Sequence, residues 1–303
     1  MASAIAGAKE GKTILLTNDI TLDEAWTPIG TKEAPFSGTF DGNGYTISGL
    51  EIDADEAAFF GYVASDATIK NVIFEDVDVN GKDAAVVAYY ADAATIENVQ
   101  VSGSVNATSY GAGIVLEGSG TIIKDCVNDA TINAGYSASG IGGWILGNAT
   151  VDGCENNGDV TGANRAGGIC ANFAGTMTDC VNNGDVVCTG GMPAGGIIGV
   201  LSGVTTIENC TNNGDVTNTG TNQWNSSAAG ILAQTPSAKV TIKSCVNSGD
   251  ITAEKSWAAG IGVSLYGGIT AEGCSNTGVI AGTKTADTVD AKGMFGGSNT
   301  VTG

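Results

Sequence analysis

A short sequence pattern returns along most of this chain at nearly constant spacing. Its clearest copy is "CVNNGDV" at 180–186, and upstream Val72 and Val99 stand at the cysteine position. Successive cysteines are separated by 28, 26, 30, 35 and 29 residues, and they are Cys126, Cys154, Cys180, Cys210, Cys245 and Cys274. A repeat of this length predicts a chain built from similar stacked units.

A second pattern, a small residue ahead of a short apolar run, keeps the same phase. Its copies begin at Ala58, Ala85, Ala112, Ser139, Gly167, Gly195, Ala229, Ala259 and Lys292. Each unit holds three short apolar or β-branched runs separated by Gly, Asn and Asp, without the period of a helix. These runs predict a parallel β-helix with three strands per coil and about nine coils. The alternative, a β-propeller, needs blades of about 40 residues with four antiparallel strands.

One repeat domain is expected over residues 13–303, after a linker or cloning remnant at 1–12. The earliest unit, 12–50, is divergent, and both ends resemble cuts from a longer protein. Insertions gather between the "GDV" and "AGI" strands, so one corner of the solenoid should carry the variable loops. No apolar stretch of about 18 residues occurs, so we expect no membrane insertion.

Charge and composition exclude several classes of function. The 303 residues include 12 Lys and Arg against 32 Asp and Glu, which gives a net charge of −20. Such an acidic chain, with Arg165 as its single arginine, argues against nucleic acid or an anionic membrane as a partner. Histidine is absent, so imidazole can serve neither as a catalytic base nor as a metal ligand.

The recurring cysteines could be metal ligands, disulfides or a stack of buried thiols. Paired C-x-x-C ligands are absent, and in-register parallel strands orient neighbouring cysteines poorly for a disulfide. Because Val72 and Val99 fill the same position, we expect the cysteines to pack inward as small apolar side chains. Cys170 and Cys188 lie outside this row and should also point inward.

Two polar rows follow the cysteine in each unit. An asparagine stands two residues later in all six copies, at Asn128, Asn156, Asn182, Asn212, Asn247 and Asn276. Stacked amides that hydrogen-bond between coils explain this row. The second row is Asp159, Asp185, Asp215 and Asp250, which we expect to be a solvated turn row, with bound Ca²⁺ as the alternative. No other cofactor is expected.

Aromatic and long side chains precede the "AGI" strands at similar positions in the variable corner. They are Tyr110, Tyr136, Arg165, Met192, Trp224 and Trp257. If exposed, the aromatic members and Arg165 would form a stripe suited to sugar rings or to a protein partner. The alternative is that they fold back and cover the stack. Trp144 and Phe173 follow their "GI" strands and are expected in the core or an end layer.

The segments "WTPIGTKEAPFSGTFDGNGYTISGLEI" and "AAFFGYVASDATIKNVIFEDV" resemble the GLUG-motif repeats of large bacterial surface and adhesin-type proteins. The later "NCTNNGDVT…AGGIIG" units are similar to repeats that accompany them, including those beside immunoglobulin A protease-type proteins. The resemblance implies a right-handed parallel β-helix on a bacterial cell surface. It implies no catalytic residue that maps onto this chain.

We therefore expect a non-catalytic stalk or adhesin module, secreted or on the cell surface, that attaches to a host glycan or protein. The first alternative is a carbohydrate-binding module that uses Tyr110, Tyr136, Arg165, Trp224 and Trp257. The second is a β-helical polysaccharide lyase or glycoside hydrolase, for which Arg165 near Asp159 is the nearest approach to a catalytic pair. The oligomeric state is left open.

Overall fold

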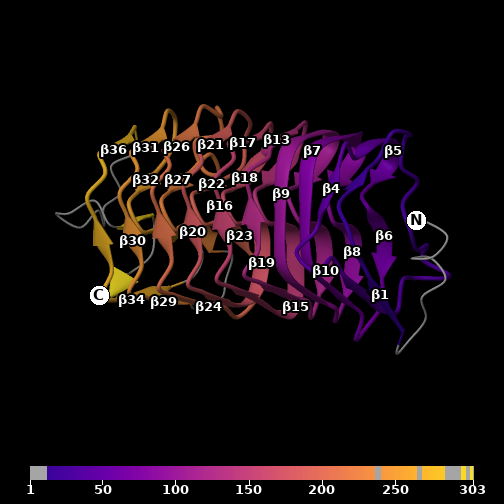
Figure 1. Ribbon diagram of the computed structural model, residues 1–303. Helices are drawn as coiled ribbons and strands as arrows, with labels where there is room; N and C mark the ends of the chain where they lie inside the picture. Colours follow the sequence, from indigo (N-terminus) through magenta and orange to yellow (C-terminus); the bar gives the residue numbers. More distant parts are fainter. Residues whose placement is uncertain (1–11, 236–239, 265–267, 284–294, 298–300, 303) are drawn as a thin grey trace.

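The computed structural model describes residues 12–235, 240–264, 268–283, 295–297 and 301–302. Every strand pairing in these ranges is parallel, and the chain winds as a rod-shaped solenoid along which the sequence runs from one end to the other (Figure 1). The predicted parallel β-helix is confirmed. Residues 1–11 of the expected leading segment and the repeat copy at Lys292 lie outside the described residues.

The first side of the solenoid shows the number of coils most clearly, because one strand from each coil stacks there. Eleven strands pair in sequence, which makes about ten turns rather than nine. The divergent first unit accounts for the difference, because it spans two coils. The strands are β1 (Thr13–Leu15), β3 (Thr39–Asp41), β7 (Thr68–Ala85), β9 (Thr95–Ala112), β11 (Ile122–Lys124), β15 (Gly142–Asp152), β19 (Cys170–Thr178), β24 (Thr206–Glu208), β29 (Val240–Lys243), β34 (Ile269–Glu272) and β38 (Val301–Thr302).

The second side begins with the strands that carry the recurring asparagine. In the early coils β7 and β9 continue through this side without a break. The other strands at the asparagine position are β2 (Ile20–Thr21), β4 (Thr46–Ser48), β12 (Val127–Asn128), β16 (Glu155–Asn156), β20 (Val181–Asn182), β25 (Thr211–Asn212), β30 (Val246–Asn247) and β35 (Ser275–Asn276). Beyond them come β5 (Glu51–Ala57), β13 (Thr131–Ala134), β17 (Val160–Gly162), β21 (Val186–Cys188), β26 (Val216–Asn218), β31 (Ile251–Ala253) and β36 (Ile280–Gly282).

The third side starts at the small-residue pattern and closes each coil. Its entry strands are β14 (Ser137–Ser139), β18 (Arg165–Gly167), β22 (Ala194–Gly195), β27 (Ala228–Ala229) and β32 (Ala258–Ala259). The chain then bends into β6 (Phe60–Val63), β8 (Ala88–Asp92), β10 (Val115–Ser119), β23 (Ile198–Leu201), β28 (Leu232–Thr235), β33 (Gly262–Ser264) and β37 (Phe295–Gly297), with β15 and β19 joining this stack.

A buried amide ladder runs through the later coils. Asn182 donates one Nδ2 hydrogen bond to Gly184 O and another to Asn212 Oδ1, both at 2.8 Å, and accepts one from Asn156 at 2.7 Å. The same pair of donations recurs at Asn128, Asn156, Asn212 and Asn247. Each amide therefore holds its own turn and joins two coils, and the expected asparagine ladder is confirmed.

The recurring glycines exist because of this ladder. An added Cβ at Gly168 would overlap the Asn182 amide, and one at Gly140 would overlap that of Asn156. Gly113, Gly196, Gly230 and Gly260 stand against Asn128, Asn212, Asn247 and Asn276 in the same way. The glycine leaves the space that the amide needs, so the two patterns that mark each repeat are the two halves of one packing contact.

The cysteines form the thiol row expected from the sequence. All eight are free, seven are buried, and Cys274 is half-buried. The Cys180 Sγ donates to the carbonyl of Thr178 at 3.2 Å, so the thiol is buried with a partner. Cys170 and Cys188 also lie in the core, where burial raises the pKa of Cys188 to about 11. Burial raises the pKa of Cys170 as well, so these two thiols are protected from reaction by both burial and protonation.

Candidate functional site

The predicted corner residues come together in two separate groups. In the first, the Tyr110 ring lies 5.3 Å from that of Tyr136 and 4.7 Å from that of Trp144. The Arg165 guanidinium lies over Trp144, 5.6 Å from its ring centre. Trp144 is half-buried and faces outward, so its expected place in the core or an end layer is wrong, whereas Phe173 is fully buried as expected.

The second group is the tryptophan pair of the longer loops. Trp224 is 63% exposed, while Trp257 is buried at 6%, and their ring centres lie 5.8 Å apart. Met192 lies in the coil between the two groups and is partly buried. The expected aromatic positions thus do not make one uniformly exposed stripe, since Trp257 folds back over the stack as the alternative interpretation held.

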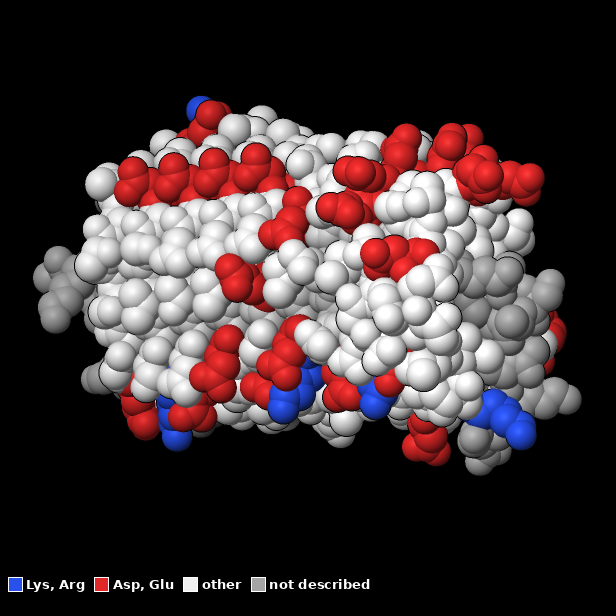
Figure 2. Space-filling model, viewed as in Figure 1, with Lys and Arg blue, Asp and Glu red and all other residues white. Residues whose placement is uncertain are grey.

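The aspartate row forms a straight acidic line over β17, β21, β26 and β31 (Figure 2). Asp159 Oδ1 accepts the backbone N–H of Asp185 at 3.0 Å, and Asp185 Oδ1 accepts that of Asp215 at 2.9 Å. Asp250 continues the same pattern. One oxygen of each carboxylate thus links two coils, which gives the row a structural role. Bound Ca²⁺ on the remaining oxygens stays a prediction.

Across the residues that the structure describes, no cluster of three or more Cys, Asp or Glu side chains is placed to hold a metal ion. In the same ranges, no helix has the length and hydropathy that crossing a membrane requires.

A groove that the sequence analysis did not identify runs along the bend between the second and third sides. Its first wall is a register of facing residues on β5, β7, β9, β14 and β18. Its second wall is a register on β6, β8, β10, β15 and β19. The first wall consists of Glu56, Asp83, Tyr110, Ser137 and Arg165, and the second of Tyr62, Tyr90, Glu117, Trp144 and Asn172. The hollows of the groove lie along the part of this bend between Tyr62 and Trp144, four strands whose spacing of about 4.8 Å gives a groove of roughly 14 Å.

The two walls touch at both ends of the groove. At the early end the Tyr62 hydroxyl donates to Glu56 Oε1 at 3.4 Å. Tyr62 also lies 5.5 Å from Tyr89 and 5.8 Å from Tyr90, measured between ring centres. At the later end the contact between Tyr110 and Trp144 closes the bend. Aromatic rings therefore line the groove from one end to the other.

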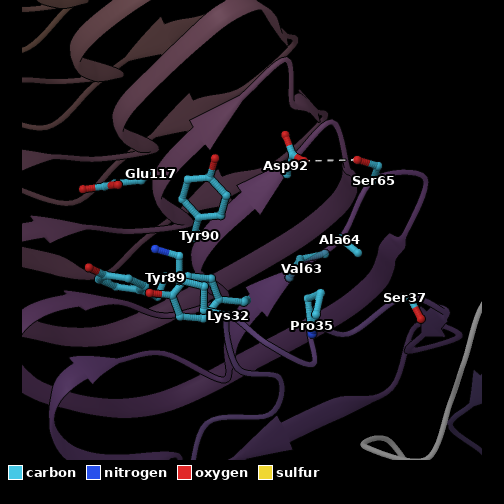
Figure 3. A pocket seen from close by; sticks show the side chains of 11 residues that line it. Lys32, Pro35, Ser37, Val63, Ala64, Ser65, Tyr89, Tyr90, Asp92 and Glu117 are labelled. Atoms are coloured by element: carbon cyan, nitrogen blue, oxygen red, sulfur yellow. Dashed lines mark hydrogen bonds between the residues drawn. The ribbon is translucent and has the colours of Figure 1, made fainter.

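Three hollows follow one another along the second wall. The largest, of about 600 Å³, is lined by Tyr62, Tyr89, Tyr90 and Glu117, with Lys32 and Pro35 from the preceding loop (Figure 3). It shares Tyr90 and Glu117 with a hollow of about 360 Å³ that reaches Trp144. It shares Lys32 and Tyr62 with one of about 450 Å³ that reaches Glu56. Together they form an open, elongated surface rather than a closed chamber.

The groove carries negative charge that the protein compensates only in part. Burial raises the pKa of the Glu117 carboxyl, and the nearby carboxylates of Asp83 and Glu56 add to this effect. Asp83 approaches Lys82 Nζ at 3.6 Å through one oxygen, while its buried Oδ1 has no hydrogen-bond partner among the described atoms. This buried oxygen is out of reach of a ligand, whereas the carboxylates of Glu117 and Glu56 line the hollows and could accept hydrogen bonds from a cationic or donating ligand.

The signal for this groove was present in the repeat register. Each second-wall residue follows a small-residue landmark at nearly constant spacing. The residues Tyr90, Glu117 and Trp144 stand five positions after Ala85, Ala112 and Ser139, respectively, and Tyr62 stands four positions after Ala58. Reading each position down the coils, rather than searching for the longest recurring pattern, would have revealed the aromatic and acidic wall.

Comparison with known proteins supports the fold and leaves the family open. A crystal structure from Bacteroides ovatus, of a protein described as a candidate immunoglobulin A1 protease, is similar over 99% of this chain and 80% of that chain. Its TM-score is 0.57 and its sequence identity 18%, so this likeness shows the fold alone. The class defined by these observations is a parallel β-solenoid with an aromatic groove.

The sequence relative is more partial. A segment of 90 residues, 29% of this chain, is 33% identical to halomucin of Haloquadratum walsbyi, of which it covers 1%. No known protein-family profile matches the chain, and its relation to GLUG-motif repeats therefore stays a prediction.

Proposed function

We propose that this chain is a β-helical attachment module of a secreted or cell-surface protein, and that it binds a glycan in the groove. The observation that carries this proposal is the continuous wall of Tyr62, Tyr90, Glu117 and Trp144, which presents aromatic faces beside polar groups. Sugar rings stack on such faces while their hydroxyls hydrogen-bond to neighbouring polar side chains. A location outside the cell is what the resemblance of the repeats to those of bacterial surface proteins implies.

The rigid solenoid suits this role. Most groove residues belong to strands that pair with both neighbouring coils, and β5 and β6 at the early end pair with β7 and β8, so a ligand would meet a surface that is already in place. Preorganisation of this kind reduces the entropic cost of binding. The alternative binding surface, the corner group with Trp224 and Trp257, is separated from this wall in the chain.

Binding of the whole chain to an array of immobilised glycans tests the proposal. Tyr90→Ala should weaken binding to the recognised glycan by about tenfold or more, since a stacked aromatic ring contributes 1–3 kcal/mol in comparable contacts. Trp224→Ala is the matched control, because it removes an exposed aromatic outside the groove. Loss of binding in Trp224→Ala but not in Tyr90→Ala would move the site to the corner, and absence of glycan binding would refute the proposal.

A second candidate function is cleavage of a polysaccharide. It is favoured by the raised pKa of Glu117 beside Asp83 and Glu56, since a protonated carboxyl near a carboxylate can act as a general acid. Release of reducing ends or unsaturated uronides from polysaccharides, lost in Glu117→Gln, would establish it. Our proposal of a non-catalytic module predicts no release in either protein.

A further inference from the structure

We propose that the groove selects glycans that carry protonated amines, with the amine held between Glu56 and Glu117 and against the faces of Tyr62, Tyr89 and Tyr90. This inference rests on the proposed glycan binding and names the chemical class of the ligand. It starts from the excess of carboxylates over cations on the two walls.

The carboxylates are brought together by the coil register. Glu56 faces Asp83 on the neighbouring strand, which places their backbones about 4.8 Å apart. Glu117 lies on the opposite wall, where burial raises the pKa of its carboxyl and the charges of Asp83 and Glu56 add to this effect. Among the described ion pairs, only Asp83 of these three has a cationic partner, the exposed Lys82. A ligand that brings its own positive charge would relieve this repulsion.

The cations near the groove do not remove this need. Lys32 is exposed and enters from the loop that precedes Phe36, and Figure 3 shows it beside Tyr89. Arg165 lies at the far end over Trp144. The Arg165 contact also shows that this groove accepts a cation on an aromatic face, which is the interaction we assign to the ligand amine.

Aromatic faces beside carboxylates discriminate against other sugars. A uronate would place a second carboxylate beside Glu117 and Asp83, and like charges at this distance repel. A neutral sugar could stack but would bring no charge to the carboxylates of Glu56 and Glu117. The ammonium of an amino sugar supplies hydrogen-bond donors and charge together, and Glu117 and Glu56 line two adjoining open hollows of about 600 and 450 Å³ that could receive it.

The test compares oligomers of glucosamine and of N-acetylglucosamine of equal length, titrated calorimetrically into the intact chain at mildly acidic pH, where the amines of the glucosamine oligomer are protonated. The glucosamine oligomer should bind about tenfold more tightly, and this preference should fall in Glu56→Gln and Glu117→Gln. Binding of the N-acetylated oligomer should change little in these variants, because the rings remain.

Because the chain is strongly acidic, attraction of any polycation must be separated from the groove. Asp185→Asn removes a carboxylate from the distant aspartate row, and it should leave the preference unchanged. An equal loss in Asp185→Asn, or equal binding of the two oligomers, would overturn the amine proposal while leaving glycan binding intact. Binding of neither oligomer nor any other glycan would overturn both proposals, and tighter binding of oligolysine would indicate a basic peptide instead.

Discussion

The early and late coils of this solenoid enclose their interiors in two different ways. Along one inner register the early coils place Ile47, Phe74 and Val101, and the next coil continues with Asn128. The residue that packs against this inner register also differs between the early and the late coils. Phe59 lies 5.0 Å from Phe74 between ring centres, whereas Gly113 faces the amide of Asn128. A coil is therefore filled either by two apolar side chains or by an amide and a glycine.

The two kinds of coil also differ in how regular their sequences are and in whether they carry the proposed binding surface. The amide-filled coils repeat closely, because each Asn must meet the next one in register and tolerates little variation. The apolar-filled coils are free of that constraint, and their third-side strands β6 and β8 carry most of the groove tyrosines. The proposed binding surface thus begins in the coils whose sequences depart furthest from the repeat.

The largest expected effect comes from breaking the ladder in its middle. Asn182→Ala removes two donated hydrogen bonds and one accepted bond, all buried, and should lower the free energy of unfolding by about 3–5 kcal/mol. Chemical denaturation measures this loss. Asn183→Ala is the matched control on the same turn, and its exposed amide should cost less than about 1 kcal/mol. Equal losses would mean that the buried ladder is not what holds these coils.

Replacing the apolar side chain inside an early coil by the amide of the late coils gives the next largest effect. Val101→Asn would extend the ladder by one coil, but Val86 stands where Gly113 stands in the next coil. We expect the single variant to lose about 1–3 kcal/mol, because the amide is buried without room to pair. Val86→Gly in the same chain should recover part of that loss. A double variant no better than the sum of the two single variants would contradict the paired-filling account.

The thiol row should tolerate replacement with a smaller effect. Cys180→Val copies the residue at Val72 and Val99, and should cost less than about 1.5 kcal/mol because volume is nearly kept. Thiol titration in denaturant should count eight groups in the parent chain and seven in the variant. Fewer than about six free thiols in the parent would show that disulfides form in place of the row.

The smallest expected effect concerns charge in the groove. Because the pKa of Glu117 is raised on folding, its protonated form favours the folded state at low pH, and that contribution is lost as pH rises through the raised pKa. Glu117→Gln removes this loss, so the variant should gain stability relative to the parent as pH increases from 4 to about 7. Thermal unfolding across this range measures the difference. A gain at acidic pH alone would reverse the sign and contradict the assignment.

The sequence predicted those features that recur in many repeats. The parallel stack, the amide ladder and the buried thiols each appear in six copies, so their periodicity identified both the fold and the inward direction of Asn182 and Cys180. The groove appears only once. Its residues Tyr62, Tyr90 and Glu117 share a position but not a residue type, so their alignment emerges only when the coil register is known.

The corner residues illustrate a further reason why the site could not be derived in full. Similar spacing before the "AGI" strand left open whether these rings are exposed or fold back, because loop length decides whether a ring points outward. Trp224 and Trp257 occupy similar positions and differ tenfold in exposed fraction, from 63% to 6%. Side-chain direction in a variable loop depends on packing that spacing alone does not encode.

The most direct test of the groove as the binding site is a crystal structure of this chain with a glucosamine oligomer. The account predicts sugar rings over Tyr62, Tyr90 and Trp144, with an amine within hydrogen-bond distance of Glu117 or Glu56. An oligomer seated instead on Trp224 or along the row from Asp159 to Asp250 would contradict it.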